Sequence, residues 1–335
     1  GHSSEWQSRR TGEMHINNGA SITVNSGAPG NTDGFIDIAS ITGNGTATFD
    51  GANSSRTTEI PGSLLGTSGT GTLTFSNHAT GNIAGYEIGT FFTSGGNGTL
   101  TVSNGGAVSM VHGFIGNFAG AVGVVTVDGA GSTWTNSGDL QVSIFGNGTL
   151  NISNGGKVSD GFGYIAQYGA TGAVTVDGVG STWTNSSDLS IGGAYGTGTG
   201  TLTITNGGAV SNDYTSIGDS AGATGIATVD GAGSTWATTG DFFAGNNGNA
   251  TLTVSNGGTL TLTNGAGYIG FNSTSTSTAT VDGAGSTWTN SSDFNVGFAG
   301  NGPLNCRNGG KLNSRIARVS RTTGASCALP IDGAR

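Results

Sequence analysis

The sequence is poor in charge, cysteine, proline and long apolar runs. Only 9% of its 335 residues are charged, and 19 acidic residues outnumber ten Lys and Arg, which gives a net charge of −9. This balance argues against a nucleic-acid partner, because phosphate contacts need clustered basic side chains. No apolar run in the sequence approaches the roughly 18 residues that a membrane-spanning helix needs.

The rest of the composition limits the fold classes that the chain can adopt. The two cysteines, Cys306 and Cys327, are too few for a secreted scaffold that depends on disulfides. The sequence has 67 glycines, but it has only four prolines and no Gly-X-Y period, so it is not a collagen. Scattered apolar residues argue against a disordered chain. The abundance of Thr, Ser, Asn and Gly predicts an all-β protein with many tight turns.

An internal repeat organises the chain. The string Val-Asp-Gly-Ala-Gly-Ser-Thr-Trp ends at Trp134, Trp236 and Trp288, and a version with Val179 in place of Ala ends at Trp183. A second string, Ser-Asn-Gly-Gly or Thr-Asn-Gly-Gly, lies between these copies. Each string recurs every 49 to 53 residues and the two alternate, so the structural step is about half of that.

Two columns of apolar residues show the half-step. The first column consists of the last residue of each apolar-Thr-apolar triplet. After one gap of 33 residues, its members recur every 24 to 28 residues. The members of the second column recur every 23 to 27 residues. The first column is Ile16, Phe49, Phe75, Val102, Val127, Ile152, Val176, Ile204, Val229, Val254, Val281, Cys306 and Ile331. The second is Ile38, Leu65, Ile88, Ile115, Val142, Ile165, Ile191, Ile217, Phe243, Ile269, Val296 and Val319.

Short strands with this period, separated by Asn-Gly and Gly-Gly turns, are typical of the coils of a parallel β-helix. We therefore predict an all-β fold: a right-handed parallel β-helix, or β-solenoid, of about 12–13 coils with a period of about 25–26 residues. A β-propeller is the alternative, since its blades also repeat at about 40–50 residues. A blade needs four antiparallel strands, however, whereas the two halves of this repeat share one strand pattern.

The half-repeats 148–156 and 174–183 resemble the repeat shared by type V autotransporter passengers and some proteins with a PEP-CTERM sorting signal. The resemblance covers roughly residues 40 to 332. It implies a secreted passenger at the surface of a Gram-negative bacterium, with a C-terminal outer-membrane β-barrel in the full-length protein and a role in virulence. Function varies among such passengers and often lies in domains outside the repeats.

The domain organisation follows from where the repeat holds. We expect residues 1–14 to be an N-terminal tail or cap and residues 15–335 to be a single β-helix passenger domain. Residues 303–335 should form an irregular, truncated terminal coil, because Pro303 and Pro330 stand at strand positions where other coils have Thr. Cys306 should be a buried apolar substitute in its column, and a disulfide to Cys327 is an open alternative.

Two aspartate columns are the candidates for catalysis: Asp128, Asp177, Asp230, Asp282 and Asp332, and Asp139, Asp188, Asp241 and Asp293. Within a column, Asp recurs every second coil, about 9.6 Å along the axis. A retaining glycosidase needs carboxyl groups about 5 Å apart and an inverting one about 6.5–9.5 Å. Identical repetition argues for a structural role, namely side-chain bonds to the turn backbone. The sequence suggests no cofactor, no metal site and no catalytic residue.

Two further groups are candidates for surface contact. Five basic residues gather late in the chain and could contact an anionic glycan, although a solvated face of the terminal coils is the simpler interpretation: Arg307, Lys311, Arg315, Arg318 and Arg321. The four repeat tryptophans could line a glycan track if they were exposed. We predict that they are buried, because a chain with 7% aromatic residues needs its largest side chains in the core.

The leading hypothesis is a structural or adhesive rod, not an enzyme, that mediates attachment or self-association at the cell surface. Its partner would be a host or matrix receptor, a glycan, or a second copy of itself. Two alternatives remain open: a carbohydrate-active enzyme on the same scaffold, and an inert stalk for an effector domain elsewhere in a longer protein.

Overall fold

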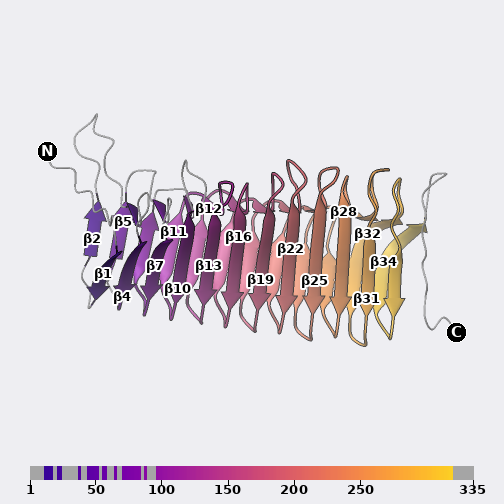
Figure 1. Cartoon of the computed structure of the whole chain (residues 1–335). Helices are drawn as coiled ribbons and strands as arrows, with labels where there is room; N and C mark the ends of the chain where they lie inside the picture. Colours follow the sequence, from indigo (N-terminus) through magenta and orange to yellow (C-terminus); the bar gives the residue numbers. More distant parts are fainter. Residues whose placement is uncertain are drawn as a thin grey trace. The chain divides into compact units, whose positions relative to one another are not determined.

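The computed structural model is an all-β parallel β-solenoid with a period of about 25 residues, which confirms the predicted fold class (Figure 1). In the described residues no helix is present, and so none that is long and apolar enough to cross a membrane. The chain divides into two compact units, residues 1–161 (unit 1) and 162–335 (unit 2). The described residues are 11–17, 21–24, 37–38, 44–52, 55–58, 64–65, 70–83, 87–88 and 96–319.

A turn of unit 1 contains a long strand, a four-residue strand and a short third strand. Strands of the same kind in successive turns pair in parallel, as β4, β7, β10 and β13 do side by side in Figure 1. The long strands are β1 (Thr11–Asn17), β4 (Asn44–Asp50), β7 (Thr70–Ser76), β10 (Asn97–Ser103), β13 (Val122–Asp128) and β16 (Asn147–Ser153). The second strands are β2 (Ser21–Val24), β5 (Ser55–Thr58), β8 (Thr80–Ile83), β11 (Ala107–Met110), β14 (Thr133–Asn136) and β17 (Lys157–Asp160), and the third are β3 (Asp37–Ile38), β6 (Leu64–Leu65), β9 (Glu87–Ile88), β12 (Gly113–Ile115) and β15 (Leu140–Val142).

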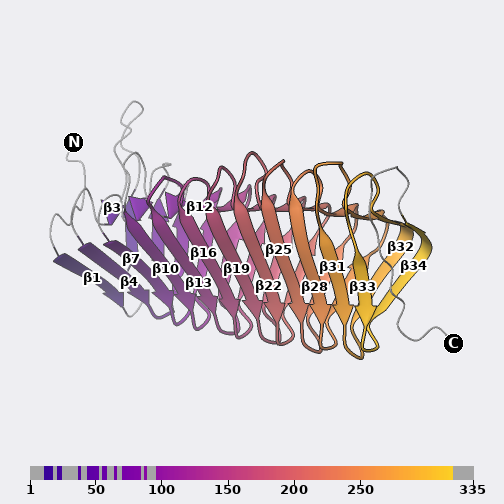
Figure 2. The same cartoon turned by 45° about the vertical axis from the view of Figure 1, so that its right-hand side comes forward.

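Unit 2 repeats this arrangement, and Figure 2 shows its long strands side by side. The long strands are β19 (Thr171–Asp177), β22 (Thr199–Thr205), β25 (Thr224–Asp230), β28 (Asn249–Ser255), β31 (Thr278–Asp282) and β33 (Leu304–Arg307). The second strands are β20 (Thr182–Asn185), β23 (Ala209–Asn212), β26 (Thr235–Thr238) and β29 (Thr259–Leu262), and the third are β18 (Gly163–Ile165), β21 (Leu189–Ile191), β24 (Thr215–Ile217), β27 (Phe242–Ala244) and β30 (Gly267–Ile269). In β32 (Thr287–Val296) and β34 (Lys311–Val319) the second and third strands are continuous.

The core lies inside the coils because every second side chain of a strand points inward. Long strands such as β10 and β13 alternate between buried and partly exposed residues, and the first apolar column supplies one buried residue of each, Val102 and Val127. One member of the second column was predicted wrongly. Ala244, not Phe243, pairs with Ile217 and Ile269 on the inner side, so Phe243 lies in the outer register.

All four repeat tryptophans are buried, as predicted. Their exposed fraction is at most 1%. Trp134 pairs with Val108 and Val158, and Trp236 pairs with Val210 and Leu260, so both of these rings lie between smaller side chains of the neighbouring turns. An outward glycan track of stacked tryptophans is therefore excluded.

The described residues near the ends of the chain add detail. Strand β1 begins at Thr11, and the expected domain boundaries stay a prediction. Pro303 lies directly before β33, which is shorter than the other long strands because proline cannot donate the ladder bond. Cys306 is half-buried rather than fully buried, and burial raises the pKa of its thiol. Cys327, Pro330, Ile331 and Asp332 lie outside the described residues, so the disulfide stays an open prediction.

Candidate functional site

The first aspartate column links neighbouring turns through side chains. The Asp128 carboxylate accepts hydrogen bonds from the Ser153 hydroxyl at 2.6 Å and the Asn154 amide at 2.7 Å. Asp177 and Asp230 repeat this pair of bonds in unit 2, with Thr205 and Asn206 and with Ser255 and Asn256. The expected partner was the turn backbone, and the observed partner is the Ser-Asn or Thr-Asn pair of the next turn. These carboxylates are therefore part of the scaffold, and the alternation of the two strings follows from this pairing.

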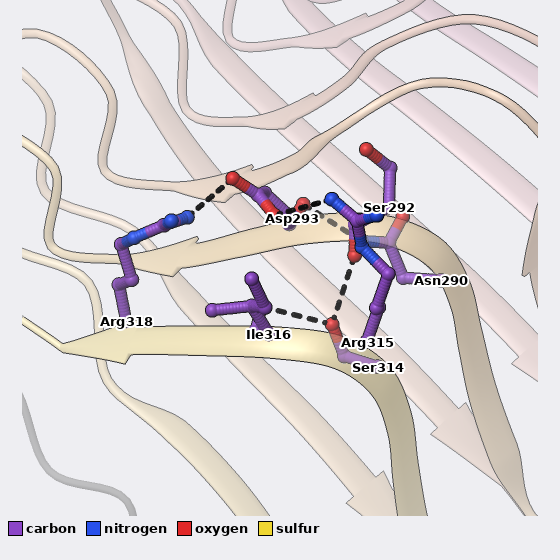
Figure 3. Close-up of polar contacts among 7 residues, drawn as sticks. All are labelled: Asn290, Ser292, Asp293, Ser314, Arg315, Ile316 and Arg318. Atoms are coloured by element: carbon purple, nitrogen blue, oxygen red, sulfur yellow. Dashed lines mark hydrogen bonds and ion pairs between the residues drawn. The ribbon is translucent and has the colours of Figure 1, made fainter.

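Four of the five predicted basic contact residues are described, and most of them are ion-paired. Arg307 Nε lies 3.3 Å from Asp282 Oδ2. Arg315 and Arg318, both on β34, reach the Asp293 carboxylate on β32, with Arg315 Nη2 at 3.7 Å from Oδ1 (Figure 3). The Arg318 guanidinium above all, with Arg315, holds the pKa of Asp293 below its ordinary value. Arg321 lies outside the described residues, and glycan contact at this cluster stays a prediction.

The second aspartate column behaves less uniformly than the first. Asp241 accepts a hydrogen bond from the Ala266 amide at 2.7 Å, and Asp293 is held by arginines. Within the described part of the chain, the Asp188 carboxylate accepts no hydrogen bond from a protein group. Burial, and then the carboxylates of Asp213 and Asp219, raise the pKa of Asp188. Asp188 is thus a half-buried carboxylate that accepts no such bond, unlike Asp241 and Asp293.

Asp188 lies in a pocket of unit 2 with a volume of about 180 Å³. The pocket has its origin in the third strands, where Tyr164, Ser190, Ser216, Phe243 and Tyr268 follow one another at the same outward register position. Two consecutive serines replace the large side chains found on either side, and this leaves a gap. The pocket is lined by Tyr164, Asp188, Leu189, Ser190, Ala194, Tyr195, Tyr214, Ser216 and Asp219.

Tyrosine rings stand around the two serines. The centroids of the Tyr164 and Tyr195 rings are 6.1 Å apart, and Tyr214 packs against Phe243 at 5.3 Å. Burial raises the pKa of Tyr214, and the nearby carboxylates of Asp219, Asp241 and Asp188 add to this shift, so the phenol stays protonated at neutral pH.

Further aromatic rings lie beyond the pocket in unit 2. Phe243 stacks on Tyr268 at 4.7 Å, and Phe271 stacks on Phe298 at 5.1 Å. Tyr195 is 59% exposed and Tyr168 is 45% exposed. We call this group the aromatic face; its members are Tyr164, Tyr168, Tyr195, Tyr214, Phe243, Tyr268, Phe271 and Phe298.

Polar groups of the pocket are arranged around Asp219. Its Oδ1 accepts hydrogen bonds from the Ser216 hydroxyl at 2.7 Å and from the Asn246 amide at 2.9 Å, whereas the Ser190 hydroxyl is 3.5 Å from Oδ2. A carboxylate can accept about four hydrogen bonds, so Asp219 retains acceptor capacity. Within the described residues no cluster of His, Cys, Asp or Glu could hold a metal ion.

The pocket was not predicted from the sequence. Its signal was the residue that precedes each second-column position, which is aromatic at Tyr164 and Tyr268 but serine at Ser190 and Ser216. The tyrosines outside the strands, Tyr195 and Tyr214, could not be placed from the repeat because they lie in connections between strands.

No model of a known protein family matches the chain, and no curated protein matches it. Among solved structures, it is similar to the crystal structure of the TibC-catalysed hyper-glycosylated fragment TibA55-350. The two share 17% sequence identity with a TM-score of 0.35, and the match covers 93% of this chain and all of that one. A similarity of this degree supports no conclusion about family or function.

Proposed function

We propose that the protein is a surface-attached β-solenoid that mediates adhesion through the aromatic face of unit 2. The observation that supports this most directly is the contrast between the scaffold and this face. The repeated carboxylates of the first column bond to the next turn, whereas Tyr168 and Tyr195 lie exposed beside a pocket. Exposed aromatic side chains that surround a pocket are typical of contact surfaces.

The resemblance to autotransporter passengers supports the wider setting of this proposal. It suggests secretion to the surface of a Gram-negative bacterium and, in a full-length protein, an outer-membrane β-barrel. The partner would be a host or matrix surface, a glycan, or a second copy of the chain. The basic residues Arg307, Lys311, Arg315, Arg318 and Arg321 are a second proposed contact region, which ion pairs with Asp282 and Asp293 make less cationic.

A settling and pull-down assay tests the proposal. The purified chain should bind cells, matrix or itself, and replacement of both Tyr168 and Tyr195 by serine should reduce this binding at least tenfold. Phe145→Ser in unit 1 is the matched control, because Phe145 is 50% exposed but lies outside the aromatic face. If the chain binds none of the three targets, or if the control reduces binding equally, the proposal is wrong.

A carbohydrate-active enzyme is the second candidate function. One observation favours it: Asp188 and Asp219 line one pocket in different environments, and burial raises the pKa of Asp188 while Asp219 accepts two close hydrogen bonds. Such a difference is what an acid–base pair requires. Release of reducing sugar from a glycan panel, abolished by Asp188→Asn, would establish this function over simple adhesion.

A further inference from the structure

We infer that the pocket between Tyr164, Tyr195 and Tyr214 binds one ring of a neutral saccharide. This inference rests on the proposed adhesive function and names its ligand class. The third-strand register provides the first argument. Ser190 and Ser216 are almost fully buried and form the floor, with Tyr164 at the register position on one side and Phe243 on the other.

Three rungs of a parallel sheet separate Tyr164 from Phe243, a distance of about 14 Å along the axis. The pocket volume of about 180 Å³ is smaller than the roughly 300 Å³ at which sites for drug-sized ligands begin. The space therefore suits a single ring of an oligosaccharide, with the rest of the chain outside the pocket.

The chemistry of the lining matches both surfaces of a sugar ring. A pyranose presents C–H groups on its faces and hydroxyls around its edge. The Tyr164, Tyr195 and Tyr214 rings offer aromatic faces for the C–H groups. Asp188 and the spare lone pairs of Asp219 can accept from the hydroxyls, and a hydrogen bond to a charged acceptor is about twice as strong as a neutral one.

The negative charge of the pocket should determine which saccharides bind there. The pocket lining contains two aspartates and no Lys, Arg or His. The carboxylate of Asp213 adds to the negative potential at Asp188, and that of Asp241 adds to it at Tyr214. A uronic acid, a sialic acid or a sulfated sugar would bring a further negative charge into this half-buried site, so neutral sugars should be preferred.

A quaternary ammonium group is the main competing ligand, because aromatic rings and carboxylates also attract cations. Such a group has no hydrogen-bond donor, however, and would make no hydrogen bond to Ser190 or Ser216 in the pocket. The aromatic face also continues past the pocket to Tyr268, Phe271 and Phe298, as an extended oligosaccharide would require.

The decisive variant fills the pocket. Ser190→Tyr places a ring at a register position where Tyr164 and Tyr268 already carry one, so the fold should tolerate it. Gln141→Tyr is the matched control, because Gln141 has the corresponding position in unit 1, where it pairs with Phe114. Asp188→Asn is the second variant and removes a charge without a change in volume. Circular dichroism would verify that each variant is folded.

The probes are neutral oligosaccharides with different terminal hexoses, the corresponding uronates, and choline. Binding is measured by ligand-observed NMR and by calorimetry. We expect neutral sugars to bind the intact chain, Ser190→Tyr and Asp188→Asn to weaken binding at least tenfold, and Gln141→Tyr to leave it unchanged. Binding of choline but not sugar, a preference for uronates, or unchanged binding by Ser190→Tyr would overturn the inference.

These results are separable from those of the attachment assay. If the chain attaches to cells but no neutral sugar binds the pocket, the inference fails and adhesion stands. If sugars bind the pocket but the chain attaches to nothing, adhesion fails and the saccharide site stands.

Discussion

Aspartates of the two repeat columns have different roles because their neighbours differ. Asp177 and Asp230 each meet a hydroxyl and an amide of the next turn, and the resulting bonds tie two turns together. Asp188 belongs to an equally regular column but faces Tyr214 and two other carboxylates. A carboxylate placed where burial and like charge disfavour it reduces stability, and sites of this kind are commonly functional.

Asp188→Asn should stabilise the protein at neutral pH. The pKa of Asp188 is raised above its ordinary value of 3.8 by burial, then by Asp213 and Asp219. A raised carboxyl pKa means that folding disfavours the charged form, so the cost is fully present above the folded-state pKa and is absent below the unfolded one. The gain in free energy of unfolding should therefore shrink as the pH falls through the raised pKa toward 3.8.

Urea unfolding between pH 3 and pH 8 would measure this difference. Asp230→Asn is the control with the opposite sign, because the charged Asp230 carboxylate accepts bonds from Ser255 and Asn256 that a neutral amide oxygen would accept more weakly. A loss of stability in Asp188→Asn at neutral pH would contradict the interpretation that burial and like charge make the Asp188 carboxylate destabilising.

Substitution of phenylalanine for the buried tryptophans of unit 2 should cost different amounts of stability. Trp236 Nε1 donates a hydrogen bond to Asn212 Oδ1 at 2.8 Å, whereas Trp288 Nε1 is buried without a partner. Trp236→Phe leaves the buried Asn212 oxygen unsatisfied, which costs about 1–3 kcal/mol. We expect Trp236→Phe to lower the free energy of unfolding by more than Trp288→Phe does, and equal losses in denaturant titrations would contradict the assignment of this bond.

At the scale of the element, the turn after each long strand explains the Asn-Gly-Gly string. Asn206 has φ 52° and Gly207 has φ 86°, both in the left-handed region, where Asn and Gly are the best-tolerated residues. Gly208 has a different reason to be glycine. A Cβ atom there would lie 2.3 Å from the Val176 carbonyl oxygen of the preceding turn, so the turns can stack closely only without it.

Gly208→Ala should consequently destabilise unit 2 by about 1–3 kcal/mol, the usual cost of forcing extra volume into a packed site. Gly196→Ala is the matched control, since its Cβ would lie 3.3 Å from the nearest atom, the Tyr168 Cα. Thermal unfolding of the two variants would give the comparison, and a Gly208→Ala variant as stable as the control would contradict the close stacking.

The strands were predictable from sequence to the extent that their apolar spacing was unambiguous. Val127, Val176 and Val229 lie in long strands at the predicted inward register because Thr alternates with them. Phe243 was misplaced because Phe242, Phe243 and Ala244 are all apolar, so alternation does not distinguish the faces. The pocket depends on connections such as those that carry Tyr195 and Tyr214, whose conformation the periodicity does not determine.

At the scale of the whole molecule, each turn gains its stability from the turns next to it. Most contacts of a solenoid turn are with its immediate neighbours, so its stability is roughly a sum of local and nearest-neighbour contributions. Side-chain bonds between turns, such as those of Asp128 in unit 1 and Asp230 in unit 2, add to the backbone pairing. An adhesive site on such a scaffold can vary in its side chains, as Ser190 and Ser216 do, without a change of fold.

Amide hydrogen exchange should accordingly be graded along unit 2. Strand β25 pairs with β22 and β28, while β34 pairs with β32 and has no second partner among the described residues. Most side chains of β34 are also exposed. Local opening of a strand costs less when it has fewer buried contacts, so amides of β34 should exchange fastest, those of β32 more slowly, and those of β25 slowest. Mass spectrometry of peptides from the three strands would measure the gradient.

Equal protection of the three strands would contradict the gradient, because unit 2 would then open as one cooperative unit. Less protection in β25 than in β34 would contradict nearest-neighbour stabilisation of the turns.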